Sequence, residues 1–259
     1  MLTLDLQKSA QKLQFSLKKK GLVQPPVMDL AFNMDVSGSF EDEHRRGLTN
    51  DLITRLVPWG LVFDPDKKLD VFTFSNGPGH VALVGEITVE NYEGFVRENI
   101  IDKVPGWNGG TDYSYVLQRN LEHFGWEKTA EQMEIKPSKG LFSKLFGGKK
   151  EAAPSAVMTP KRSLVIHVTD GEANKSDEEK TQSVLRQSAK RNDCVYFLFI
   201  GISNQPEKFD FIGRLASDFP NVGLAVITDL KKFVDMSDDE LNDLLIGDEL
   251  MQWLKQTGA

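Results

Sequence analysis

Three short stretches of the chain carry oxygen-bearing side chains where a strand would end or a helix would begin. DVSGS carries Asp35, Ser37 and Ser39, GGTDY carries Thr111, and VTDGE carries Asp170. Read singly, the hydroxyls could cap helices and the Asp-Gly pair could form a turn. Read together, hydroxyls and carboxylates are the ligands of a hard cation, Mg²⁺ or Mn²⁺, which favours octahedral oxygen coordination and keeps some waters.

The residues around these candidate ligands narrow the choice of metal. No cysteine or histidine accompanies it, which argues against zinc. Asp112 and Glu172 flank the candidate ligands, either as outer groups that support them or as solvated charges. Asp177 is interpreted as a solvated acid at a helix start, where negative charge suits the helix dipole. Because hydroxyls leave a divalent cation under-neutralised, the cation should attract a carboxylate from outside the chain.

Apolar runs alternate with amphipathic stretches along the chain, which predicts an α/β fold with a mostly parallel central sheet of about six strands and helices on both faces. Strands are predicted at 27–35, 69–75, 80–87, 163–170, 194–202 and 222–227. Helices are predicted at about 1–20, 42–57, 89–101, after Thr111, and at 177–190, 206–217 and 237–256. Ligands of such sheets bind outside the carboxyl ends of the strands, where the three stretches should therefore meet.

Local signals refine these elements. Ser176 with Glu179, and Ser237 with Glu240, have the spacing of capping boxes. The first strand departs from the expected pattern, because a strand buried on both faces should be apolar throughout and this one carries Asp29 and Asn33. Part of that face is therefore predicted to be wet or covered by the N-terminal helix.

The chain is predicted to contain an amphipathic helix and linker, residues 1–24, followed by one α/β domain, residues 25–259. This domain contains a flexible basic insertion at about 128–162 and ends in a helix at about 237–256. Within the insertion, the stretch 140–150 interleaves leucine and phenylalanine with lysine. Two interpretations remain open for it, a disordered linker or contact with an anionic membrane surface or a partner groove.

Composition excludes several classes of protein. The net charge of -7 argues against nucleic-acid binding, which needs a basic face. The longest apolar run, CVYFLFI, is much shorter than the roughly 20 residues of a membrane-spanning helix. The N-terminus shows no secretory signal, and the single cysteine excludes an internal disulfide. We therefore expect a cytoplasmic protein.

The order Asp35-x-Ser37-x-Ser39, then Thr111, then Asp170 in TDG resembles the metal-ion-dependent adhesion site (MIDAS) of von Willebrand factor type A (vWA) domains. The resemblance implies a Rossmann-like vWA fold. It also implies that the serines and the threonine coordinate the ion directly or through water, and that a Glu or Asp of a protein partner completes the coordination shell.

The resemblance covers about residues 27–230. GGTDY and the helical tail are most similar to vWA domains found with bacterial tellurium-resistance proteins, which implies a role in tellurite resistance or stress response. Two features depart from that group. Its members can carry an extra N-terminal β-rich domain that this chain lacks, and methionine is common where Phe40 stands.

Three functions from different classes fit these observations. The first is a non-enzymatic module that binds an acidic partner residue through Mg²⁺ or Mn²⁺. The second is a Mg²⁺-dependent phosphohydrolase with Asp35 as nucleophile. It would resemble haloacid-dehalogenase-like phosphatases, which need a second aspartate two residues on as general acid, where this chain has Ser37. The third is a metal-free scaffold that acts through its tail and insertion.

Overall fold

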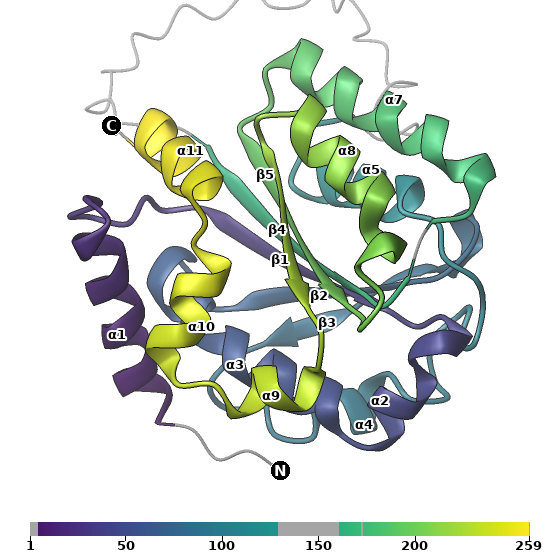
Figure 1. Cartoon of the computed structure of the whole chain (residues 1–259), viewed down its shortest axis with the longest axis horizontal. Coiled ribbons are helices and arrows are strands. Elements are labelled where there is room, and N and C mark those ends of the chain that lie inside the picture. The colour runs from purple at the N-terminus through teal and green to yellow at the C-terminus, as the bar shows by residue number, and fades with distance from the viewer. Residues whose placement is uncertain (1–4, 129–160, 172, 259) are drawn as a thin grey trace, which may run out of the picture.

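The computed structural model describes residues 5–128, 161–171 and 173–258 (Figure 1). Six strands form one sheet in the order β3-β2-β1-β4-β5-β6. Only β3 runs antiparallel to its neighbour, β2, and the remaining pairs are parallel. The strands are β1 (Asp29–Asp35), β2 (Leu69–Phe74), β3 (Val81–Ile87), β4 (Ser163–Thr169), β5 (Val195–Ile202) and β6 (Val222–Ile227). The predicted mostly parallel α/β sheet of about six strands is confirmed.

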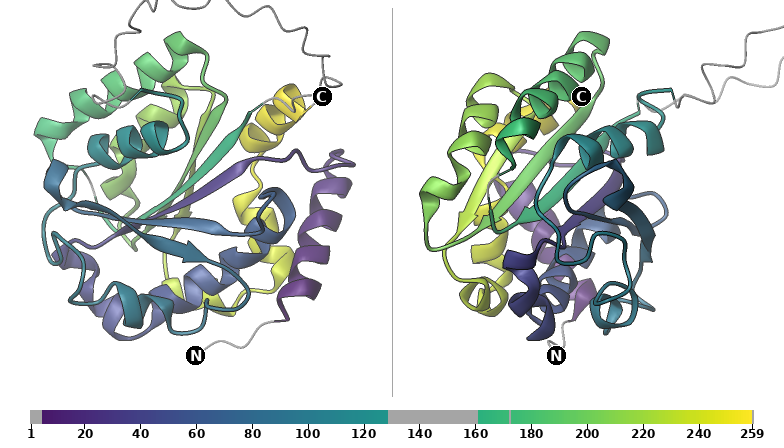
Figure 2. Two further views of the ribbon diagram at one scale, coloured as in Figure 1. Left: turned by 180° about the vertical axis from the view of Figure 1, so that it is seen from behind. Right: turned by 90° about the vertical axis from the view of Figure 1, so that its right-hand side faces the viewer.

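Helices cover both faces of this sheet (Figure 2). In the described part of the chain they are α1 (Leu6–Lys19), α2 (Glu41–Arg45), α3 (Leu48–Phe63), α4 (Phe95–Asn99), α5 (Ser114–His123), α7 (Lys175–Arg191), α8 (Asp210–Asp218), α9 (Leu230–Asp235), α10 (Asp238–Leu245) and α11 (Asp248–Gly258). No described helix is both long enough and apolar enough to cross a bilayer.

Two apolar clusters hold the helices to the sheet. α5, α7 and α8 pack on one face against Phe72, Phe74, Phe197 and Phe199. α3, α9, α10 and α11 pack on the other face. α1 lies outside this second layer, against α3 and α10 (Figure 1). Asp238, the first residue of α10, accepts hydrogen bonds from Ser9 on α1 and from Arg55 on α3, each at 3.0 Å.

The polar residue in the first strand has a different explanation from the one predicted. Asn33 is fully buried and exchanges two hydrogen bonds, of 2.7 and 3.1 Å, with Asn120 of α5. Its amide also donates to Nδ1 of His167, a core histidine of β4 (3.2 Å). At Asn33 this face is therefore neither wet nor covered by α1, whereas Asp29 at the start of the strand is partly exposed. A polar position is tolerated at Asn33 because a facing helix satisfies it.

Several predicted helices are divided or shortened. The helix expected at 42–57 is divided into α2 and α3. Gly47 lies between them, and its φ of 78° is in the left-handed region, which glycine adopts readily. The C-terminal helix expected at about 237–256 is broken at Ile246, which leaves the helical conformation and is fully buried. The helix expected at 89–101 is reduced to α4.

One predicted capping box is confirmed and the other is wrong. Ser237 and Glu240 exchange the expected hydrogen bonds at the start of α10. Ser176 instead lies inside α7, which begins after Asn174. Most of the predicted insertion, including 140–150, lies outside the described residues, as does Glu172.

Candidate metal centre

The centre of the candidate site is the carboxylate of Asp35, at the carboxyl end of β1. Met34 pairs with Val168 of the adjacent β4, so Asp35 and Thr169 end neighbouring strands. Thr169 Oγ1 donates to Asp35 Oδ2 (2.7 Å), and Ser37 N donates to Asp35 Oδ1 (2.8 Å). The Asp35 side chain is fully buried, and both of its oxygens are held in place.

Two hydroxyls join this region to the second aspartate. The Oγ atoms of Ser37 and Ser39 lie 3.2 Å apart, and Ser39 Oγ donates to Asp170 Oδ1 (2.9 Å). Asp170 follows β4 directly. Four of the five residues predicted as ligands therefore form one connected group, although 131 positions separate Ser39 from Asp170.

Thr111 is held at the same edge by its backbone. Asn108 N donates to Val36 O (2.9 Å), and Gly38 N donates to Gly109 O (3.0 Å). The loop before Thr111 therefore runs beside residues 35–39, which we call the first arm of the site. The Thr111 carbonyl accepts from Asn174 N (2.8 Å). Among the described residues, no hydrogen bond links the Thr111 hydroxyl to the other four predicted ligands.

The close approach of this loop depends on Gly109. A methyl group there would lie 2.6 Å from Asn76 Oδ1 and 2.8 Å from Ser75 Oγ. Asn76 Oδ1 also accepts the hydrogen bond of Gly110 N (2.8 Å), so it is not free to move away. The loop must shift instead, and it would carry Thr111 with it.

We expect Gly109→Ala to weaken Mg²⁺ binding at least about tenfold, the scale found when groups that position metal ligands are disturbed. Calorimetric titration of the folded variant measures this effect. Gly79→Ala is the matched control, because an added methyl group there meets no atom within 4 Å. Equal Mg²⁺ affinities of the two variants would contradict the positioning role of the loop.

The electrostatics of the site favour a bound cation. Burial raises the pKa of Asp35 to about 7, and the nearby Asp170 carboxylate adds to the increase. Burial also raises the pKa of Asp170, against the opposing charge of Lys208. The described residues contain no group of three or more His, Cys, Asp and Glu side chains that could hold a metal, so any ion at this edge must use the hydroxyls. A hard divalent cation fits this oxygen set and supplies the positive charge that the buried carboxylate lacks.

His44 supports the first arm of the site, a role that the sequence analysis missed. Its Nε2 lies 2.9 Å from the Asp35 carbonyl oxygen, which can only accept, so Nε2 carries the hydrogen. Nδ1 then accepts from Thr49 Oγ1 (2.9 Å). Burial lowers the pKa of His44 to about 4, which keeps the ring neutral in this arrangement at physiological pH. No sequence spacing signals this role, because the partner is a backbone carbonyl.

The two flanking aspartates position loops. Asp112 accepts from Gly77 N (2.8 Å) and from Asn174 Nδ2 (2.7 Å). Asp177 was predicted to be solvated, and this is wrong because it is buried. It accepts from the backbone N–H groups of Tyr113 (2.7 Å) and Ser114 (3.0 Å), and from the hydroxyls of Ser114 and Thr181. Asp177 therefore holds the start of α5 directly after the Thr111 loop.

The sheet has six strands, is mostly parallel, and carries this group of hydroxyls and carboxylates where its parallel strands end. This is the architecture of a von Willebrand factor type A domain. The family described as the vWA domain found in the TerF C terminus matches residues 28–259, and the chain belongs to this family. The match confirms the predicted vWA membership and its narrower similarity to the tellurium-resistance group.

Individual proteins are similar to this chain at low sequence identity. The chain is 24% identical to the uncharacterised protein YcbR of Bacillus subtilis (strain 168), over 99% of this chain and 88% of that protein. Among solved structures it is similar to proximal thread matrix protein 1 of the mussel byssus (19% identity, TM-score 0.48, 88% of this chain). It is also similar to the pilus adhesin SpaC of Lactobacillus rhamnosus GG (11% identity, TM-score 0.43, 90% of this chain). The chain spans 49% of the first structure and 31% of the second.

Proposed function

We propose that this chain is a metal-dependent protein-interaction module. Asp35, Ser37, Ser39, Thr111 and Asp170 would hold Mg²⁺ or Mn²⁺ directly or through water, and a Glu or Asp of a protein partner would complete the shell. The observation that carries this proposal is the buried Asp35 carboxylate joined to Asp170 through Thr169, Ser37 and Ser39, an oxygen set suited to a hard cation.

We further propose that the module is not an enzyme. In a phosphohydrolase Asp35 would attack the substrate, and a general acid would have to protonate the leaving group. The position where a general acid is required is occupied by Ser37, a hydroxyl that does not titrate near neutral pH. This feature supports binding rather than attack.

The cellular setting is proposed from family membership. We propose that the protein acts in the cytoplasm, in a bacterial tellurite-resistance or stress-response system. The TerF-type match over residues 28–259 supports this proposal. The partner would be a protein with an exposed acidic segment, since the site offers a cation whose remaining coordination positions favour carboxylate oxygen.

Calorimetric titration with Mg²⁺ and with Mn²⁺ tests the metal site. We expect saturable binding to the wild-type chain and loss of at least about hundredfold in affinity in Asp35→Ala, which removes the central ligand. Asp218→Asn, at the exposed end of α8, removes one negative charge outside the site and should bind like the wild type. Thermal melts with chelator show that each variant is folded.

Affinity capture and a phosphatase assay then distinguish the interaction module from the metal-free scaffold and the hydrolase. A partner bound in Mg²⁺ and released by chelator, and not retained by Asp35→Ala, supports the interaction module. A partner that chelator does not release would favour the metal-free scaffold. Phosphate release from a generic aryl phosphate that depends on Asp35 would favour the hydrolase.

A further inference from the structure

A polar cavity of about 340 Å³ lies beside the metal centre, at the same edge of the sheet. Its lining comes from the segments that follow β5 and β6, from the α2–α3 corner and from the turn before α8. Asp170 lines the cavity and also belongs to the connected group of predicted ligands. A ligand at the metal would therefore have this cavity as its immediate neighbour.

Some of the charged groups at this cavity are already engaged. The Asp229 carboxylate caps α9, accepting from Lys231 N (2.9 Å) and Lys232 N (3.2 Å). The Lys231 ammonium group pairs with Asp235 (2.6 Å). Four charged side chains remain around the cavity: Glu43, Arg46, Asp170 and Lys208.

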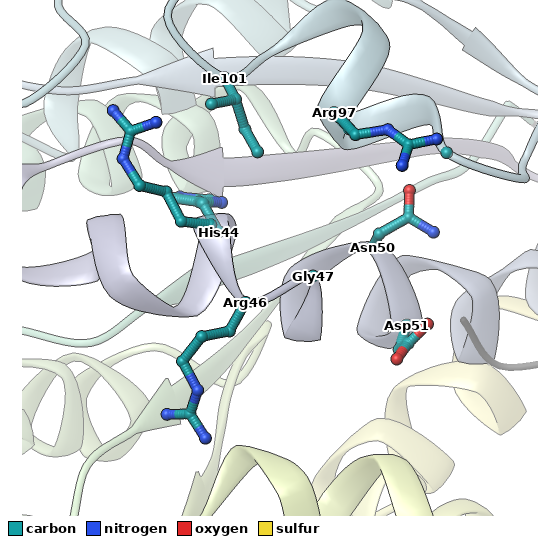
Figure 3. A pocket seen from close by; sticks show the side chains of 9 residues that line it. His44, Arg46, Gly47, Asn50, Asp51, Arg97 and Ile101 are labelled. Carbon is teal, nitrogen blue, oxygen red and sulfur yellow. The ribbon is translucent and has the colours of Figure 1, made fainter.

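The two cations in this group are available to a ligand. Within the described part of the chain, the side chains of Arg46 and Lys208 make no hydrogen bond or ion pair, whereas that of the adjacent Arg45 is held by Glu41 and Asp102. Arg46 lines this cavity and also a second cavity of about 450 Å³ that Arg97 and Ile101 line, and Figure 3 shows its guanidinium group extending away from both of these residues. The Arg46 side chain is therefore common to the two cavities.

Metal binding would change the balance of charge in this cavity. Before metal binds, Arg46 and Lys208 face the carboxylates Glu43 and Asp170, and their charges lower the pKa values of these acids against the increase caused by burial. A bound divalent cation neutralises the charge of Asp170. Three lining cations, Arg46, Lys208 and Lys231, then face two lining acids, Glu43 and Asp229, and the cavity carries excess positive charge next to the partner-binding position.

We propose that this cavity, the Arg46–Lys208 pocket, binds a second acidic side chain of the same partner segment. The inference rests on the proposed function and extends it. One carboxylate of the partner would complete the metal shell, and a carboxylate nearby in its sequence would pair with Arg46 and Lys208. The partner segment is thus an acidic peptide with two carboxylates. The second contact strengthens once metal is bound, because Asp170 then no longer competes for Lys208.

Synthetic peptides with blocked ends test this proposal on the full chain. One series carries two glutamates separated by glycine–serine spacers of different length, and control peptides carry a single glutamate. Fluorescence polarisation is measured in Mg²⁺ and in chelator. In Mg²⁺ we expect the best two-glutamate peptide to bind about tenfold tighter than the one-glutamate peptide, since two exposed ion pairs are added.

Reversing the charge of single side chains tests whether Arg46 and Lys208 bind the second glutamate. Lys208→Glu and Arg46→Glu should abolish the advantage of the second glutamate while leaving Mg²⁺ binding measurable by calorimetry. Lys190→Glu, exposed in the last turn of α7, makes the same change in net charge and should preserve the advantage.

The outcomes distinguish this inference from the proposed function. An equal advantage in all three variants, or equal binding of both peptide series, overturns the Arg46–Lys208 pocket but leaves metal-dependent binding intact. Absence of binding by either series to the Mg²⁺-loaded protein overturns the acidic-peptide partner. Failure of Mg²⁺ to bind the wild-type chain overturns the proposed function itself.

Discussion

Replacing Asp35 with asparagine is expected to abolish Mg²⁺ binding and, at neutral pH, to make the metal-free protein more stable than the metal-free wild type. Asparagine can keep the local geometry. Its Oδ1 can accept from Ser37 N, and its Nδ2 can donate to Thr169 Oγ1, whose hydrogen can turn to the Gly171 carbonyl oxygen. The substitution therefore removes a buried negative charge without leaving its neighbours unpaired.

The expected pH dependence follows from the raised pKa of Asp35. In the unfolded chain this carboxyl ionises near its ordinary pKa of 3.8, whereas in the folded chain it stays protonated up to about pH 7. The folded state thus binds more protons in this interval, so the free energy of unfolding falls as pH rises from about 4 to about 7. The total loss is on the order of 4 kcal/mol.

Urea denaturation in chelator at a series of pH values measures this dependence. The stability advantage of Asp35→Asn should be absent near pH 4 and reach its full size above pH 7. Saturating Mg²⁺ should reverse the order, because only the wild type gains stability from the bound ion. A metal-free wild type that is more stable than Asp35→Asn at pH 7.5 would show that the buried carboxylate is already compensated.

Asp177→Ala is expected to destabilise the chain by about 3 kcal/mol and to weaken Mg²⁺ binding. The substitution leaves the buried N–H groups of Tyr113 and Ser114 without their acceptor, together with the hydroxyls of Ser114 and Thr181. Unpaired buried donors cost about 1–3 kcal/mol each. Because Thr111 precedes Tyr113 by two residues, a loosened start of α5 also loosens this predicted ligand.

Urea denaturation and Mg²⁺ calorimetry measure the two effects on the same variant. Glu179→Ala is the control, since Glu179 is an exposed acid on the same helix. If Asp177→Ala matched the control in both measurements, the hydrogen bonds to the start of α5 would contribute nothing to the site.

The sheet and the local order of the site were predictable because their signals are local in sequence. Strands buried on both faces appear as continuous apolar runs, as in CVYFLFI, and the Ser237–Glu240 capping box needs only its own helix. The association of Asp35 with Asp170 could be predicted because parallel strands bring their carboxyl ends to one edge of a sheet.

The predictions that were wrong or missing concern contacts between elements that are far apart in the sequence. Asp177 carries the usual signal of an exposed acid at a helix start, yet α7 turns it inward to hold α5. Asn33 interrupts a buried strand because Asn120, 87 positions later, provides its partner. His44 binds a backbone carbonyl, which no residue pattern encodes. In each case the deciding partner lies on another element, and its identity cannot be read from neighbouring residues.

The distance in sequence between the two arms of the site has a consequence for protein synthesis. Asp35 meets Thr169 across 134 positions, and Ser39 meets Asp170 across 131. A ribosome makes the first arm long before β4 exists, so the nascent chain cannot assemble the full ligand set until residue 170 has left the exit tunnel. Loading of the proposed metal site should therefore follow the synthesis of β4, and a truncated product that ends before β4 should not compete for the ion.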